Sequence, residues 1–374
     1  MKIGIMSMQR ICNYGSFLQA YALKQLIESL GHEVLFVDYR PGKPVGYKQK
    51  KKNYLKSLLR ETCIDIVSPF VQFIFFSTAE QRHSLNFRER YKREFLPLIG
   101  VHDKKEYNTK VDVLIIGSDE VFNCLQNNPL VGFSEELFGK CHNANSLISY
   151  AASFGNTTYE GIRNFGKVET LGNLLMNFNA LSVRDENSFG IIKALTNIDS
   201  NIHLDPVLVY DFKNEIVRPK VNEEYIVVYA YRNRLTIEEK KYIKDFAIKE
   251  NKKLYAIGGY QDFCDCNITG TPFEILGYMM CASFVITDTF HGTIFAVISG
   301  KKFVTFVRKG NGEKYGNYEK LMDLLRRLGL EDRGIFSPSD IEKKIFNDIN
   351  YSSVNHIIEE HRNNAIVYLK SNLL

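Results

Sequence analysis

The sequence lacks the long apolar segments of a membrane-spanning or secreted chain. Its first residues, MKIGIMSMQR, have no apolar core followed by a cleavage site of small residues, as a secretory signal would have. The apolar stretch at 63–76, CIDIVSPFVQFIFF, is too short to cross a bilayer, and Asp65 and Pro69 interrupt it. We therefore expect a cytoplasmic protein.

The chain also lacks a cysteine pattern of the kind that binds zinc or forms a disulfide framework. Its seven cysteines are odd in number and irregularly spaced. Cys264 and Cys266 are separated by a single residue, which is too close for a usual zinc pair. We predict that the thiols are structural or incidental and that no metal is bound.

A strong excess of one charge is absent as well. The net charge of +5 is well short of the basicity of a dedicated nucleic-acid-binding protein, so we expect no nucleic-acid partner. The charge is nevertheless uneven, because no acidic residue lies between Asp38 and Glu61, while basic residues accumulate from Arg40 to Arg60. This basic segment predicts a solvated loop followed by a buried helix. The alternative is an amphipathic segment that rests on an anionic membrane surface, at the inner membrane face.

The order of the apolar segments predicts an α/β protein with two domains. A strand (KIGIM), an amphipathic helix (SFLQAYALKQLIESL) and a second strand (HEVLFVDY) form a β-α-β pattern, which is typical of a parallel sheet. A second series begins at YIVVYAY, 225–231, and 374 residues suffice for two cores. We predict a first domain at 1–212 with a basic and apolar insertion at about 40–105, a second domain at 222–345, and a C-terminal helix at 346–374 in a position to cross back to the first domain.

Helix starts support this division. Thr157 to Glu160 and Thr236 to Glu239 have the spacing of capping boxes, and Thr271 precedes Pro272 at a predicted first helical position. Ligands of parallel α/β sheets bind at the carboxyl ends of the strands. Four loops therefore matter most, at 7–16, 117–123, 153–157 and 287–293.

The first of these loops favours an anion site. The helix is expected to begin at Gly15 or Ser16, so that its free N–H groups and positive dipole end lie beside Asn13 and Tyr14. Simple capping by Asn13 or Ser16 is the alternative. The loop lacks the glycine spacing of a dinucleotide-binding motif or a P-loop, so neither NAD nor ATP is implied.

Two charged residues follow predicted strands. Asp119, in GSDEVFN, could act as an acid, a base or a hydroxyl binder, or could cap a following helix. Arg184 lies at a strand-to-helix turn, where a guanidinium can hold a carboxylate or phosphate through two parallel hydrogen bonds. A salt bridge with Asp185 or Glu186 is the alternative for Arg184.

His291 is the candidate for proton transfer. It follows an apolar strand in ITDTFHGTIF and lies at the head of a helix, in a position that points to the predicted cleft. A helix N-terminus disfavours the imidazolium form unless an anion is bound nearby. A packed core histidine is the alternative, but we predict that His291 is catalytic.

Taken together, these motifs resemble the polysaccharide pyruvyl transferase family, and the resemblance spans most of residues 1–306. The segments that carry it are Asn13-Tyr14-Gly15-Ser16, Gly117-Ser118-Asp119-Glu120, Tyr150 to Gly155, Ser182 to Glu186, Leu204-Asp205-Pro206-Val207 and Thr289-Phe290-His291-Gly292-Thr293. The resemblance implies two Rossmann-like domains with parallel sheets facing across a cleft, as in GT-B glycosyltransferases. It also implies transfer of pyruvate from phosphoenolpyruvate to a sugar, as a ketal.

The resemblance places His291 on the family's histidine and Arg184 on the arginine of its Ser-Val-Arg segment. Many members carry an arginine two residues before the histidine, where this chain has Thr289, so a contact to the donor anion must come from elsewhere. Candidates are Arg308, Lys309, Lys314 and the weaker Arg232, with a solvated basic loop as the alternative. Further substrate-binding residues expected from the shared motifs are Asn13, Tyr14, Gly15, Ser16, Ser118, Gly292 and Thr293.

The implied chemistry suits these residue types. Phosphoenolpyruvate carries a carboxylate and a phosphate, which Arg184 and two helix N-termini can bind. We expect His291 to act as acid and base, and Asp119 to bind or deprotonate an acceptor hydroxyl. The scheme needs no cofactor. The expected acceptor is a hexose in a lipid-linked saccharide, within the biosynthesis of a capsule or exopolysaccharide.

Two other functions fit the same sequence. A GT-B glycosyltransferase that uses a nucleotide sugar would share the architecture and the basic site. A catalytically degenerate protein that binds sugars or anions would account for Thr289.

Overall fold

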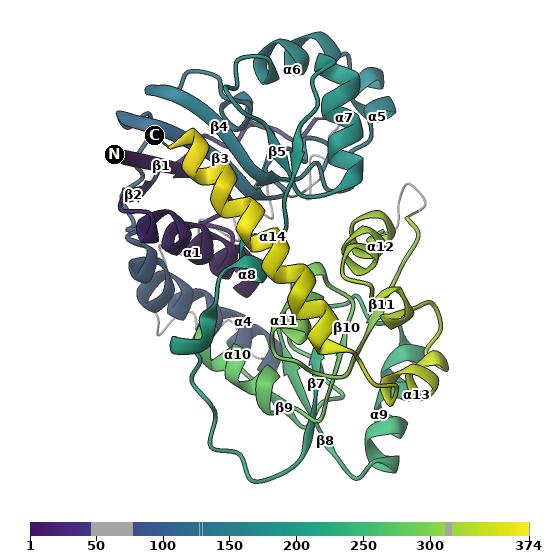
Figure 1. Ribbon diagram of the computed structural model, residues 1–374. Helices are drawn as coiled ribbons and strands as arrows, with labels where there is room; N and C mark the ends of the chain where they lie inside the picture. Colours follow the sequence, from purple (N-terminus) through teal and green to yellow (C-terminus); the bar gives the residue numbers. More distant parts are fainter. Residues whose placement is uncertain (46–77, 127, 129, 311–315, 374) are drawn as a thin grey trace.

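The computed structural model describes residues 1–374 except 46–77, 127, 129, 311–315 and 374. The described residues form two six-stranded parallel sheets, which lie in opposite halves of the molecule (Figure 1). The strand order is β2-β1-β3-β4-β5-β6 in the first sheet and β12-β11-β10-β7-β8-β9 in the second. The predicted α/β class with two Rossmann-like domains is confirmed.

The strands of the first sheet are β1 (Lys2–Met6), β2 (Glu33–Phe36), β3 (Val111–Asp119), β4 (Ala144–Ala152), β5 (Ser182–Val183) and β6 (Asn201–Ile202). Those of the second are β7 (Tyr225–Tyr229), β8 (Lys253–Ile257), β9 (Cys266–Asn267), β10 (Phe284–Thr287), β11 (Phe303–Phe306) and β12 (Gly334–Ile335). The α-helices of the first half are α1 (Tyr14–Ser29), α4 (Ala79–Arg90), α5 (Tyr159–Asn164), α6 (Val168–Leu175), α7 (Glu186–Thr196) and α8 (Pro206–Val209). Those that follow are α9 (Ile237–Lys249), α10 (Pro272–Cys281), α11 (Phe290–Ile298), α12 (Tyr318–Arg327), α13 (Asp340–Ile345) and α14 (Tyr351–Asn372).

The central strands are apolar because helices cover both faces of each sheet. In β3, VDVLIIGSD, all residues except Asp112 are buried, as expected of a parallel strand inside such a sheet. Its register pairs Ile3 of β1 with Val113, and Val113 with Ser146 of β4. The apolar run therefore ends with Asp119 at the carboxyl edge of the sheet.

Two of the three predicted helix starts are confirmed. Thr236 and Thr271 each cap a helix and form complete capping boxes with the glutamate three residues later. The predicted box at Thr157 is wrong, because Thr158 caps α5 instead. The hydroxyl of Thr157 donates to Oδ1 of Asn123 and accepts from the N–H of Leu125, so it is engaged with a neighbouring loop.

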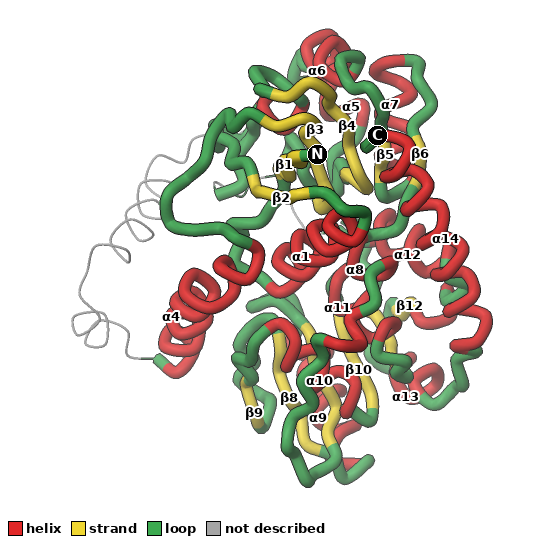
Figure 2. The backbone as a smooth tube through the Cα atoms, turned by 60° about the vertical axis from the view of Figure 1, so that its left-hand side comes forward, coloured by secondary structure: helices red, strands yellow, loops and turns green. Residues whose placement is uncertain are grey.

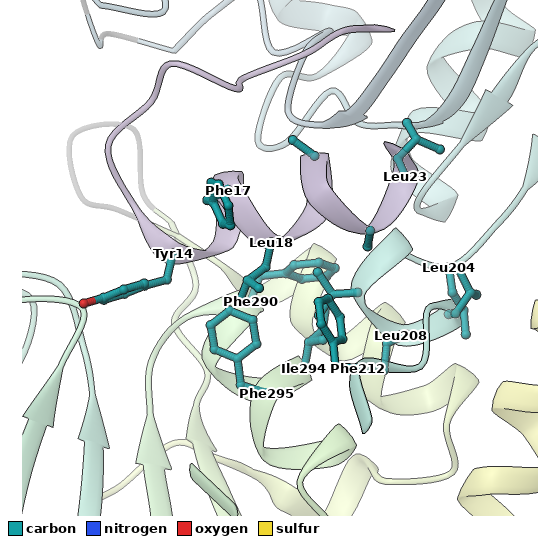
Figure 3. Packing of buried hydrophobic residues seen from close by; sticks show 14 of the residues in the cluster. Tyr14, Phe17, Leu18, Leu23, Leu204, Leu208, Phe212, Phe290, Ile294 and Phe295 are labelled. Atoms are coloured by element: carbon teal, nitrogen blue, oxygen red, sulfur yellow. The ribbon is translucent and has the colours of Figure 1, made fainter. Parts of the chain in front are cut away.

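One apolar core joins the two halves of the molecule. It includes buried side chains of α1, α8, α11 and α14 together with residues of both sheets. Figure 3 shows Leu18 of α1 beside Phe290 and Phe295 of α11, with Leu208 of α8 nearby. All residues of α8 are buried, so this short helix lies in the middle of the shared core.

The C-terminal helix α14 runs from the second half of the molecule back along the first (Figures 1 and 2). The hydroxyl of Tyr368 donates to the carbonyl of Ser149 in β4 at 2.8 Å. Nε of Arg362 donates to the carbonyl of Val209 in α8 at 2.5 Å. These contacts fasten the end of the chain to the first sheet and to α8.

Helix α4 stands beside α1, at the side of the molecule (Figure 2). Most of the basic segment from Arg40 to Arg60, and the apolar stretch after it, lie outside the described residues. At its start, Nη1 of Arg40 pairs with Oε1 of Glu136 at 2.8 Å. In the described ranges, no helix combines the length and the apolar character needed to cross a membrane.

Candidate active site

A cavity of about 430 Å³ lies where the carboxyl ends of the two sheets approach each other. The first half contributes polar side chains from the start of α1, the end of β3 and the turn after β5, and the second half contributes the start of α11, the loop after β7 and α12. The lining includes Asn13, Ser16, Asp119, Glu120, Arg184, Arg234, Thr289, Phe290, His291 and Lys320. The cavity is thus the expected meeting point of the loops that the sequence singled out.

His291 lies in the first turn of α11, which Thr289 caps through a hydrogen bond from the N–H of Gly292 to Oγ1, at 2.9 Å. The side chain is buried, with 7% of the residue exposed, and still lines the cavity. Nε2 lies 3.4 Å from Oδ2 of Asp205, but it has no hydrogen-bond partner among the described residues. A buried ring nitrogen at a cavity wall, whose only charged neighbour among the described residues is this carboxylate at 3.4 Å, is suited to meet a ligand.

Arg184 follows β5 and is 3% exposed. Its Nη1 donates to Oδ2 of Asp205 at 2.8 Å and lies 3.7 Å from Oδ1 of Asp119. Its guanidinium carbon lies over the ring of Phe290, 4.2 Å from the centroid, in a cation–π contact. Burial lowers the pKa of Arg184, but the surrounding carboxylates, Asp205 first among them, outweigh it and raise the pKa.

The sequence did not mark Asp205 as a site residue, although it lies in one of the family-like segments. The structure places it at the N-terminus of α8, where Oδ1 accepts from the N–H of Val207 at 3.1 Å and Oδ2 faces Arg184 and His291. Burial alone would raise the pKa of this carboxyl. Its interactions with His291 and Arg184 outweigh burial and lower the pKa to about 2, so Asp205 is ionised. An Asp-Pro pair shortly after a strand was the only local signal.

Asp119 ends β3 with a φ of 73°, in the left-handed region that L residues seldom adopt. Oδ2 accepts from Oγ of Ser16 at 2.8 Å, and Oδ1 accepts from the N–H of Glu120 at 2.9 Å. Asn13 caps α1, because its Oδ1 accepts from the N–H of Ser16 at 2.7 Å. The start of α1 and the end of β3 are therefore joined through Ser16 at the cavity wall.

An ion pair connects the two halves of the molecule across the cavity. Nζ of Lys320 in α12 lies 2.6 Å from Oε1 of Glu120. Burial would raise the pKa of Glu120, but Lys320 outweighs it and the pKa falls to about 2. Sequence reasoning missed Lys320, since 200 residues separate it from its partner and no local pattern connects them.

Arg234 is a second cation that the sequence did not single out. It lies in the loop after β7, lines the cavity, and has its guanidinium carbon 4.6 Å from the ring centroid of Tyr231. It shares the cavity wall with Thr289, the position where the family resemblance led us to expect an arginine. Among the residues that the structure describes, the arginine and lysine side chains that line the cavity from the second half are Arg234 and Lys320.

Several predicted site residues lie behind the cavity wall. The hydroxyl of Tyr14 donates to the carbonyl of Gly270 at 3.0 Å, and Figure 3 shows the side chain directed away from Phe290 and Phe295. Oγ of Ser118 accepts from the N–H of Asp119, and the hydroxyl of Thr293 donates to the carbonyl of Thr289. These residues support the site from within the fold.

The two predicted glycines allow close packing around His291. A Cβ at Gly15 would come within 2.2 Å of Nδ1 of His291, and a Cβ at Gly292 within 2.2 Å of Oγ1 of Thr287. Both positions therefore require the absence of a side chain.

Of the predicted substitutes for the missing arginine, the three that the structure describes do not line the cavity. Arg232 is exposed and pairs with Glu80, outside the cavity lining. Arg308 forms two hydrogen bonds with Glu239, at 2.6 and 3.0 Å. The Nζ of Lys309 lies 5.2 Å from the ring centroid of Tyr318. Lys314 lies outside the described residues.

Metal ligation has no obvious place in the described part of the chain. Among residues 1–45, 78–126, 128, 130–310 and 316–373, no three side chains of histidine, cysteine, aspartate or glutamate gather as metal ligands.

Two parallel α/β domains with a polar cavity between the carboxyl ends of their sheets define a GT-B-like architecture. Residues 13–310 match the polysaccharide pyruvyl transferase family, and the chain belongs to this family. The membership confirms the family that the motifs predicted and identifies a transferase of polysaccharide biosynthesis. No curated protein matches the sequence.

Similar solved structures include transferases and an epimerase. The O-GlcNAc transferase of Thermobaculum terrenum shares 13% identity at a TM-score of 0.41, over 99% of this chain and 64% of that one. The UDP-GlcNAc 2-epimerase of Methanocaldococcus jannaschii shares 11% identity at a TM-score of 0.48, over 98% and 99% of the chains. The spinosyn rhamnosyltransferase SpnG shares 11% identity at a TM-score of 0.48, over 99% of each.

Proposed function

We propose that this pyruvyl transferase moves pyruvate from phosphoenolpyruvate onto two hydroxyls of a hexose, forming a ketal in a surface polysaccharide. One observation carries the proposal. His291 and Arg184 meet around one buried carboxylate at the cavity, and Nε2 of the first and Nε of the second lack hydrogen-bond partners among the described residues. Because both residues line one cavity, a single ligand there can meet an acid-base group and an anion-binding group together.

The donor's two anionic groups need more than one cation. Arg184 supplies one, and its contact with Phe290 fixes the orientation of its guanidinium. We assign the second to Arg234, which lines the opposite wall in place of an arginine at Thr289. The N-termini of α1 and α11 add oriented N–H groups beside these cations.

The proton steps follow from the chemistry of an enol phosphate. His291 gives a proton to the methylene carbon, which leaves C2 cationic, and a sugar hydroxyl attacks C2 while losing its proton to Asp119 or to the now neutral His291. The bond between C2 and the phosphate oxygen then breaks, and the second hydroxyl bonds to C2. In the balance, one hydroxyl proton ends on the new methyl group and the other leaves with inorganic phosphate. No cofactor takes part in this scheme.

We further propose a lipid-linked saccharide as the acceptor, met at the inner membrane face. The basis is the basic segment between Arg40 and Arg60, which would attract anionic lipid or a pyrophosphate-linked acceptor. Replacing Lys50, Lys51 and Lys52 by glutamine should reduce flotation with anionic vesicles. Unchanged flotation would leave the segment without this role.

The direct test is phosphate release from phosphoenolpyruvate, with lipid-linked or synthetic galactosides and mannosides as acceptors. We expect acceptor-dependent release by the wild type and a loss of about 100-fold or more in His291→Ala, because general acid-base catalysis contributes about that much. His356→Ala is the matched control, since this histidine lies on α14 with 76% of its side chain exposed. Equal release by wild type and His291→Ala would remove His291 from the mechanism.

Ligand-induced thermal stabilisation separates this function from its rivals. Stabilisation by phosphoenolpyruvate and not by UDP supports pyruvyl transfer. The reverse result would favour a glycosyltransferase that uses a nucleotide sugar. Saturable binding of sugar or phosphate with no turnover of any donor would favour a binding protein.

A further inference from the structure

One carboxylate oxygen is shared by the anion-binding group and the acid-base group. Oδ2 of Asp205 accepts a hydrogen bond from Nη1 of Arg184 at 2.8 Å and lies 3.4 Å from Nε2 of His291. The three residues come from separate elements, since Arg184 follows β5, Asp205 precedes α8 and His291 lies in α11. All three are buried, so solvent screens their interactions only weakly.

We propose that Asp205 is a positioning residue that couples binding of the donor anion at Arg184 to protonation of His291. In the free protein, the positive charge of Arg184 offsets much of the field of Asp205 at the imidazole. An anion beside Arg184 offsets that positive charge in turn, so His291 experiences more of the carboxylate's negative charge and holds a proton more strongly. The imidazole of His291 is thereby protonated once the donor is bound. This inference rests on the proposed assignment of Arg184 to the donor.

Other charged groups at the cavity do not share this geometry. Oδ1 of Asp119 lies 3.7 Å from Nη1 of Arg184, and its Oδ2 accepts a hydrogen bond from Ser16. Glu120 is engaged with Lys320 at 2.6 Å. Arg234 lines the cavity from the loop after β7. Against His291 itself, α1 presents the backbone of Gly15, and α11 presents the rings of Phe290 and Phe295.

Asp205 is suited to transmit the effect because it stays ionised. The interactions that hold its pKa at about 2 leave it unprotonated throughout the neutral range. A proton taken up on donor binding is therefore not bound by Asp205. Its other oxygen is fixed by the N–H of Val207, which keeps the carboxylate aimed at both partners.

The test is isothermal titration calorimetry of the whole protein with phosphoenolpyruvate, in two buffers that differ in ionisation enthalpy. A pH of about 8 keeps the donor's phosphate fully ionised, because the second pKa of a phosphate monoester is about 6. We expect net proton uptake on binding to the wild type. Asp205→Asn, whose side-chain oxygen can still accept from Val207, should lose most of this uptake, and His291→Gln should lose it as well.

The matched control is Asp38→Asn. Asp38 is likewise a buried carboxylate paired with an arginine, at 2.5 Å from Nε of Arg10, but it does not line the cavity. Its variant should keep the proton uptake of the wild type. Uptake in Asp205→Asn equal to that of the wild type, or persisting in His291→Gln, would overturn the coupling. Binding without any proton uptake would overturn it while leaving the donor assignment intact, whereas failure of phosphoenolpyruvate to bind the wild type would overturn both.

Discussion

The imidazole of His291 lies directly against the backbone of Gly15, at the first turn of α1. A Cβ at position 15 would come within 2.3 Å of Cγ and 2.2 Å of Nδ1, closer than real Cβ atoms approach a ring. The two helices that meet here come from different halves of the molecule. Gly15 therefore determines how near the acid-base group can come to the rest of the site.

Gly15→Ala should displace the ring and lower kcat for phosphate release by about 100-fold, since a misplacement of about 1 Å can cost that much. Gly190→Ala in α7 is the control, because its Cβ would meet nothing within 4 Å. Alanine there is expected to keep activity and to add about 1 kcal/mol to the free energy of unfolding. Full activity in Gly15→Ala would mean that the ring position is irrelevant to turnover.

Arg234→Gln should raise the KM for phosphoenolpyruvate by about tenfold or more, because a hydrogen bond to a charged group is worth about 1.5–3 kcal/mol. Arg232→Gln removes the same charge two residues earlier, outside the cavity lining, and should leave KM unchanged. Steady-state kinetics on both variants decide the matter. An equal rise in both would point to general electrostatic attraction and away from a specific contact.

Asp288 should destabilise the folded protein at neutral pH. Burial outweighs the nearby Arg234 and Arg308 and raises the pKa of this carboxyl to about 6, so folding opposes its ionisation. A raised folded-state pKa means that the cost is absent well below the unfolded value, near 4, and is fully present above about pH 6. Asp288→Asn should therefore gain about 3 kcal/mol in urea unfolding at pH 8 and little at pH 4. A variant that is less stable at pH 8 would contradict this expectation.

Asp205, in contrast, should stabilise the folded protein at neutral pH. Its folded-state pKa of about 2 lies below the unfolded value, so ionisation stabilises the fold above about pH 4, and this contribution is lost as the pH falls toward 2. We expect Asp205→Asn to lose about 2 kcal/mol in urea unfolding at pH 7. The difference from the wild type should shrink between about pH 4 and pH 2. A difference that does not vary with pH would mean that the carboxylate acts by packing alone.

The ion pair between Glu120 and Lys320 should couple the two halves of the molecule. A double-mutant cycle with Glu120→Gln and Lys320→Met should give an interaction free energy of about 1–2 kcal/mol in urea unfolding, since the contact is short and both side chains are at least half-buried. Lowering the pH toward the Glu120 pKa of about 2 should abolish the coupling. Additive effects of the two changes at neutral pH would show that the pair contributes nothing to stability.

Local patterns in the sequence were sufficient for the fold. The alternation and caps around β1 and α1, the apolar run of β3, and the boxes at Thr236 and Thr271 all produced the elements that they predicted. Each of these signals extends over a few residues, so the hydrogen-bond partners are close together in the sequence. The prediction at Thr157 failed because its hydroxyl hydrogen-bonds to a loop more than 30 residues away in the sequence. A capping pattern contains no information about such a distant partner.

The site was only partly predictable, for a related reason. His291, Arg184 and Asp119 could be selected because each lies at or just after the end of a strand, at the carboxyl edge of a sheet. The charged partners of the site residues could not be predicted in this way. The sequence offered Asp185 and Glu186 beside Arg184, whereas in the structure Arg184 pairs with Asp205. Lys320 pairs with Glu120 across a sequence separation of 200 residues. Long-range pairing of charges depends on tertiary structure and leaves no spacing in the chain.

Because one apolar core runs through α1, α8, α11 and α14, neither domain is an independent module. A domain grafted from another transferase would have to fit the buried faces of these helices as well as the cavity, including the bare backbone at Gly15. Recombination of whole domains is therefore a poor route to new specificity in this chain. Variation is better tolerated at the cavity lining, where Thr289 and Arg234 lie outside the shared apolar core.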